Sequence, residues 1–82
     1  MPVSHMDVVE RIARVIAGRV LSANADGNDP SAGERVDAAW HDYRDDAVSI
    51  LRTLREPDEA MARAGDVAIW QRMIAAALGE GA

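Results

Sequence analysis

The sequence contains no cysteine, lysine or phenylalanine, and its aromatic residues number three, two tryptophans and one tyrosine. Without cysteine, neither a disulfide framework nor a thiolate metal site can support a small core. Apolar runs are short as well: the longest, residues 73–78, is well below the ~18 residues that a membrane span requires. The first residues lack the basic and apolar segments of a secretory signal. We therefore expect a soluble, cytoplasmic protein with no cofactor and no membrane contact.

The charge balance is acidic. Fourteen acids face nine bases, all of them arginine, for a net charge of −5. Nucleic-acid binding requires a basic stripe that neutralises phosphates, and the arginines do not cluster. This distribution predicts no nucleic-acid partner.

At 82 residues the chain has the length of one domain, residues 1–82. Apolar residues make up 49%, but sixteen of them are alanine, which leaves few large side chains for a core. A core of this size usually supplies only about 3–5 kcal/mol of stability. We therefore expect association with protein, including a second copy of the chain.

Two long amphipathic helices are predicted in the first two thirds of the chain. One opens with a capping box at Ser4 and runs to about Ala23, and its apolar residues recur at 3.6-residue spacing. A loop follows over residues 24–33. The second helix begins between Pro30 and Glu34 and ends near Arg55. It carries a narrow apolar stripe, which we call the predicted stripe: Val36, Trp40, Tyr43, Ala47, Ile50 and Leu54.

Proline and glycine divide the remainder into two short helices. Pro57 stops the long helix and suits the first turn of a third, residues 58–64. Gly65 is expected to close that helix in the left-handed conformation, and Asp66 to cap a fourth over residues 67–78, which Gly79 ends. No strand pattern appears. The predicted fold is all-α, a small bundle of three to four helices with a long central helix.

Two acidic groupings suggest metal ions. An EF-hand loop starting at Asp26 fails at two positions, because Pro30 and Ser31 fall at its fifth and sixth places, the sixth requiring glycine. Asp37, His41 and Asp45 lie at i, i+4 and i+8 on the second helix, where they would form a weak cation site or a solvated acidic face. One helix alone rarely closes a site, so the solvated face is the preferred interpretation.

A second acidic spacing superficially resembles MazG-like nucleotide pyrophosphohydrolases. Asp7 and Glu10 are followed by Glu34 and Asp37, and in those enzymes paired acidic motifs on facing helices hold magnesium. The resemblance implies a magnesium-dependent nucleotide hydrolase as an alternative function. Nucleophile elbows, phosphate loops and dinucleotide fingerprints are absent, so we expect no enzymatic activity.

Aromatic residues on the apolar faces indicate either core positions or a binding surface. The candidate protein interface consists of Trp40, Tyr43, Trp70 and Met73. A third functional hypothesis is an acidic decoy that mimics nucleic acid and inhibits a DNA-binding protein. Its mimic face would consist of Asp37, Asp42, Asp45 and Asp46.

One run of sequence resembles a family of small, uncharacterised proteins from proteobacterial phage and prophage regions. The most specific part is the Arg-Glu-Pro-x-Glu-Ala-Met pattern within Leu54-Arg55-Glu56-Pro57-Asp58-Glu59-Ala60-Met61-Ala62-Arg63-Ala64-Gly65. The similarity extends to Glu10-Arg11-Ile12-Ala13-Arg14, Asp29-Pro30, Trp40-x-x-Tyr43 and Trp70-x-x-Met73-Ile74-x-Ala76-Ala77-Leu78. It covers nearly the whole chain, although the segment between Gly65 and Trp70 is shorter here than in many relatives. The resemblance implies a phage context, but no activity and no functional residues.

These observations favour a phage- or prophage-type module that binds protein without catalysis and forms a homo-oligomer. No small-molecule substrate is evident from the sequence.

Overall fold

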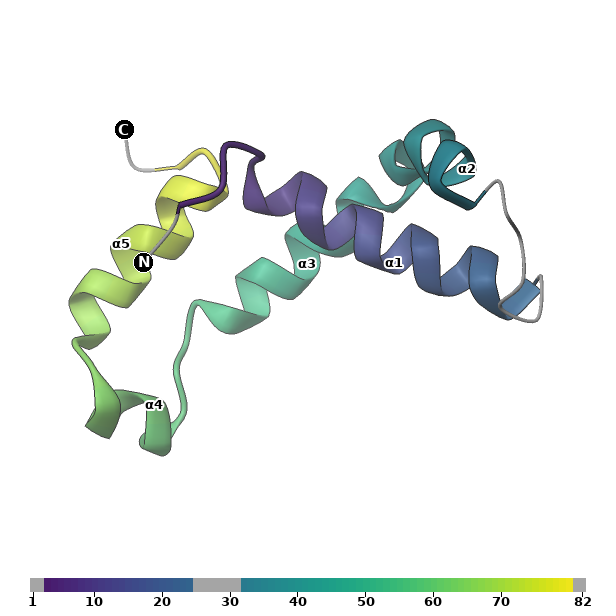
Figure 1. Cartoon of the computed structure of the whole chain (residues 1–82). Coiled ribbons are helices and arrows are strands. Elements are labelled where there is room, and N and C mark those ends of the chain that lie inside the picture. Colours follow the sequence, from purple (N-terminus) through teal and green to yellow (C-terminus); the bar gives the residue numbers. More distant parts are fainter. Residues whose placement is uncertain (1–2, 25–31, 81–82) are drawn as a thin grey trace. The chain divides into compact units, whose positions relative to one another are not determined.

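The computed structural model describes residues 3–24 and 32–80. Its helices are α1 (Val8–Asn24), α2 (Ala32–Ala39), the 3₁₀ turn η1 (Trp40–Tyr43), α3 (Arg44–Leu54), α4 (Glu59–Ala64) and α5 (Val67–Ala77) (Figure 1). Among these residues there is no strand. The EF-hand loop considered at residues 26–31, and the capping residues Asp29 and Pro30, lie outside the described residues.

The all-α fold class is confirmed, and so is the long central helix. The segments α2, η1 and α3 follow one another without a gap from Ala32 to Leu54, as the small-bundle prediction requires. The interruption at η1 was not predicted. Four residues at 120° per residue instead of 100° add about 80° of rotation. Beyond η1 the predicted stripe is still buried at Ala47 but is exposed at Ile50 and Leu54.

The residues group into two compact units, Met1–Ala47 and Val48–Ala82, which we call the N-terminal unit and the C-terminal unit. The prediction of a single domain over residues 1–82 stays a prediction.

In the N-terminal unit α1 and α2 form an antiparallel pair. Helix α1 contacts both α2 and η1. A Cβ built on Gly18 would lie 3.8 Å from Val36 Cγ2, whereas Arg14, one turn earlier, reaches Asp37. Residues nearer the N-terminus of α1 thus lie beside residues nearer the C-terminus of α2. Figure 1 shows α2 beside the C-terminal half of α1.

The buried side of α1 agrees with the predicted apolar face at Val9 but also contains two alanines that the prediction left out. Its fully inward positions are Val9, Ala13 and Ala17, spaced four residues apart. Val15, expected on the apolar face, is 64% exposed. Alanine was overlooked because its small side chain contributes little to a hydrophobic pattern, yet small residues allow close helix approach.

The start of α1 is also capped by a different residue than predicted. Asp7 Oδ1 accepts a hydrogen bond from the Glu10 amide at 2.7 Å, and the Asp7 carbonyl accepts one from Arg11. Ser4 instead contacts Met6, two residues along. The helix therefore begins one turn later, because aspartate is an equally good cap and sits directly before the first apolar residues.

The C-terminal unit is organised by helix caps. Asp58 accepts from the Met61 amide at 2.9 Å, and Asp66 accepts from the Ile69 amide at 3.0 Å. At the end of α5, Gly79 has φ +77°. The Gly79 and Glu80 amides donate to the carbonyls of Ala76 and Ala75 in a Schellman motif. These boundaries lie within one residue of the predicted third and fourth helices, but Pro57 precedes the N-cap Asp58 and is not in the first turn of α4 as predicted.

One cap prediction is wrong. Gly65 was expected in the left-handed conformation, but its φ of −158° and ψ of −166° are extended backbone that any residue adopts. The chain needs an extended residue here because Asp66, which follows directly, already starts α5 as an extended N-cap.

Few large side chains of the C-terminal unit are buried. Leu51 and Ile74 are inside, whereas Ile50 and Leu54 of the predicted stripe are 43% and 39% exposed. In α3 the stripe prediction is confirmed at Ala47, which is fully buried as Leu51 nearly is, and it is wrong at Ile50 and Leu54. Trp70 connects the end of α3 to α5, since its Nε1 donates to the Leu54 carbonyl at 2.7 Å.

Candidate functional site

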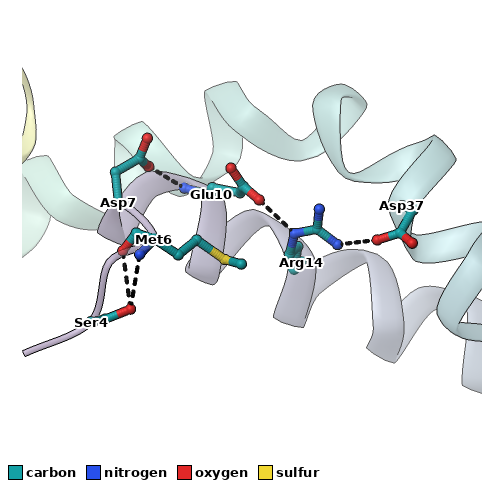
Figure 2. Close-up of polar contacts among 6 residues, drawn as sticks. All are labelled: Ser4, Met6, Asp7, Glu10, Arg14 and Asp37. Atoms are coloured by element: carbon teal, nitrogen blue, oxygen red, sulfur yellow. Dashed lines mark hydrogen bonds and ion pairs between the residues drawn. The ribbon is translucent and has the colours of Figure 1, made fainter.

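A polar cluster in the N-terminal unit centres on Arg14. The guanidinium donates from Nε to Glu10 Oε2 at 2.8 Å and from Nη1 to Asp37 Oδ1 at 2.5 Å (Figure 2). It also lies over the Trp40 ring, 5.4 Å from the ring centroid. The hydrogen bonds to Asp37 and Glu10 raise the pKa of Arg14 above its ordinary value. This cluster joins α1 to α2 and η1.

The same contacts bear on the magnesium hypothesis. Glu10 and Asp37 both bind the Arg14 guanidinium, and Asp7 accepts from a backbone amide as the α1 cap. Glu34 lies exposed in the first turn of α2. Across residues 3–24 and 32–80, no three histidine or carboxylate side chains are grouped to hold a metal ion. The geometry therefore gives the hydrolase alternative no support.

The acidic face of the central helical segment is divided among three elements. Asp37 lies in α2, His41 in η1 and Asp45 in α3, so the expected stripe on one helix is not continuous. The His41 ring lies 3.8 Å from the Trp40 ring, measured between centroids. The remaining mimic residues, Asp42 and Asp46, are exposed. The acidic-decoy hypothesis stays a prediction.

The four predicted interface residues fall in both units. Trp40 and Tyr43 are half-buried in η1 of the N-terminal unit. Trp70 and Met73 lie in α5 of the C-terminal unit, where Trp70 is half-buried and Met73 is 61% exposed. Trp40 is engaged by Arg14, whereas Met73 presents its side chain to solvent.

Trp70 and Met73 line an apolar groove of about 360 Å³ in the C-terminal unit, which we call the α4–α5 groove. Asp66 is the one charged residue along it, and its carboxylate already caps α5. Water molecules in such a groove form few hydrogen bonds with its apolar walls. Covering this surface with another apolar surface would therefore lower the free energy. The lining consists of Pro57, Met61, Ala64, Gly65, Asp66, Val67, Ile69, Trp70 and Met73.

Sequence reasoning missed most of this groove. The signal was Ile69, a large apolar residue off the predicted apolar face of its helix and 47% exposed. Met61, in the short helix α4, belongs to the Arg-Glu-Pro-x-Glu-Ala-Met pattern and is 38% exposed. Single exposed apolar residues are common on protein surfaces, and these become informative only because the fold joins them into one patch along the groove.

A second, polar depression lies in the same unit and is lined by Arg52, Thr53, Arg55, Glu56 and Gln71. Arg55 Nη2 donates to Glu80 Oε1 at 2.7 Å, while the buried Nε of Arg55 has no hydrogen-bond partner. The pair ties the turn after α3 to the end of α5. Its charges are internally compensated, so the depression has no net attraction for an ion.

Comparison with known proteins adds no relationship: no family model, no curated protein and no solved structure matches this chain. In addition, no helix within the described part of the chain has the length and apolar character to cross a membrane.

Proposed function

We propose that this protein is a non-enzymatic interaction module that works by binding protein through the α4–α5 groove, and that it self-associates through this surface. The phage or prophage setting and the cytoplasmic location are part of the proposal and rest on the sequence. The observation that carries the binding function is the groove itself, because its walls are almost wholly apolar and open to solvent.

Three exposed side chains strengthen this assignment. Met61, Ile69 and Met73 all line the groove, and all are more than one third exposed. Methionine side chains adapt to partner surfaces, since they are unbranched and polarisable. The groove also adjoins Trp70, the type of residue that most often contributes strongly to interfaces.

Sedimentation as a function of concentration tests the proposal. The unmodified chain is expected to dimerise at about 10–100 µM, in the range of modest protein interfaces. Met73→Glu introduces a charge into the groove and should weaken association at least tenfold. Val15→Glu is the matched control, because Val15 is similarly exposed (64%) but lies on α1.

An unmodified chain that remains monomeric at ~1 mM would overturn self-association. Equal weakening by Met73→Glu and Val15→Glu would overturn the assignment of binding to this groove. Circular dichroism of each variant ensures that the helices are intact.

A further inference from the structure

We infer that the α4–α5 groove is a site of reversible oxidation, at which conversion of Met61 and Met73 to methionine sulfoxide weakens protein binding. The inference rests on the proposed function and adds its regulation. It is carried by the placement of the thioethers: two of them lie exposed in the groove, whereas none of the buried side chains in the described part of the chain is a methionine.

The sulfur atoms of this protein are all thioethers, because the sequence has four methionines and no cysteine. Met61 and Met73, which line the groove, are 38% and 61% exposed. Met6, which precedes α1 in the N-terminal unit, is 42% exposed. Peroxide therefore reaches the groove methionines in the folded chain, without any opening of the core.

The reaction is a transfer of one oxygen atom. A sulfur lone pair attacks one oxygen of hydrogen peroxide and the O–O bond breaks. The leaving hydroxide takes the proton of the transferred oxygen, so that one sulfoxide and one water form. Thiol-dependent reductases reverse the step, because two thiols become a disulfide and the oxygen leaves as water. The side chain stays in place but changes from apolar to polar.

The walls of the groove offer no side-chain partner to a sulfoxide oxygen, which is a hydrogen-bond acceptor. Among the lining side chains the one N–H donor is the Trp70 indole, and it already donates to the Leu54 carbonyl at 2.7 Å. Asp66 is itself an acceptor. In the free chain water satisfies the sulfoxide, but a covering apolar surface would leave it unpaired. Oxidation therefore disfavours the bound state and leaves the free state folded.

Peroxide treatment followed by sedimentation tests the inference. The unmodified chain is oxidised with hydrogen peroxide at ~1 µM, where it is expected to be monomeric, and is then concentrated. Peptide mass spectrometry should find sulfoxide at Met61 and Met73, and the dissociation constant for self-association should rise at least about tenfold. The circular dichroism should not change. Treatment with methionine sulfoxide reductase should restore association.

Two leucine variants separate the groove from the other methionines. The double variant Met61→Leu/Met73→Leu keeps apolar side chains of similar volume, so it should associate like the unmodified chain and continue to do so after peroxide treatment. Met6→Leu is the matched control, because Met6 is similarly exposed but lies in the other unit. It should lose association on oxidation as the unmodified chain does.

The outcomes distinguish this inference from the proposed function. If association survives oxidation of both groove methionines, or if peroxide weakens the double variant equally, the inference is overturned and the proposed function stands. A loss of helical signal on oxidation also overturns it, since weaker association would then follow from unfolding. If the unoxidised chain does not associate at all, the proposed self-association is overturned, and its regulation with it.

Discussion

The two units of this protein both have small cores, but different kinds of contact hold their helices. In the N-terminal unit, α1 buries alanine side chains, and Arg14 connects its helix to α2 by one ion pair and to η1 by a ring contact. In the C-terminal unit, backbone and side-chain caps define the helices, while large apolar side chains remain exposed around a groove. The difference is that small and charged side chains make the helix contacts of the first unit, whereas the second unit leaves large apolar side chains exposed.

The largest effect on stability is expected from truncating one of the few buried side chains of the C-terminal unit. Leu51→Ala should lower the free energy of unfolding by about 2–4 kcal/mol, through lost burial and a residual cavity. Urea unfolding followed by circular dichroism measures it. Leu54→Ala, the same change at a 39% exposed position of α3, should cost about half as much or less. Equal losses would mean that α3 has no distinct inward side.

Placing a larger side chain in the core of the N-terminal unit should lower the free energy of unfolding by a somewhat smaller amount. Ala13 is fully buried, so Ala13→Leu is expected to destabilise the chain by about 1–3 kcal/mol. Ala68→Leu, on the exposed surface of α5, is the matched control and should change stability little. A neutral Ala13→Leu would contradict the close packing that distinguishes this unit.

Removing a cap should have a moderate effect in the C-terminal unit. Asp58→Ala removes the acceptor for the Met61 amide, at a cost of about 1 kcal/mol. Asp58→Asn retains an acceptor and should recover most of that stability. If both variants unfold alike, capping is not what holds α4.

The smallest expected effect is a gain. Gly18→Ala should stabilise α1 by about 0.5–1 kcal/mol, because alanine loses less backbone entropy in a helix. The added Cβ would meet Val36 Cγ2 at 3.8 Å, an ordinary van der Waals contact. A loss of stability in the same unfolding assay would show that α1 and α2 lie closer than this distance allows.

Local signals predicted most of the helix boundaries. The caps Asp58 and Asp66, and the glycine after α5, act on neighbouring backbone groups, so their effect is readable from adjacent residues. The 3₁₀ turn at Trp40–Tyr43 was not predicted, because the periodic apolar pattern runs through it unbroken. For the same reason the pattern includes Ile50 and Leu54, which are exposed, beside Ala47, which is buried.

The candidate site, like the helix boundaries, could be predicted only in part from the sequence. Trp70 and Met73 were found because large apolar residues stand out in a helical pattern, but Pro57, Met61 and Gly65 join them only through the folding of α4 and α5 about one groove. The carboxylates Glu10 and Asp37 were grouped as metal ligands from their spacing. Spacing does not reveal that Arg14 lies between them.

The sequence by itself determined the all-α class, most of the ends of the helices, and the lack of any disulfide or thiolate support, since these depend on residue types and on interactions within a few residues. Tertiary structure alone decided which side of each helix is buried, which acids are neutralised by arginine and where apolar side chains stay exposed. Those outcomes depend on contacts between residues far apart in the chain, whose free energies have no local signature.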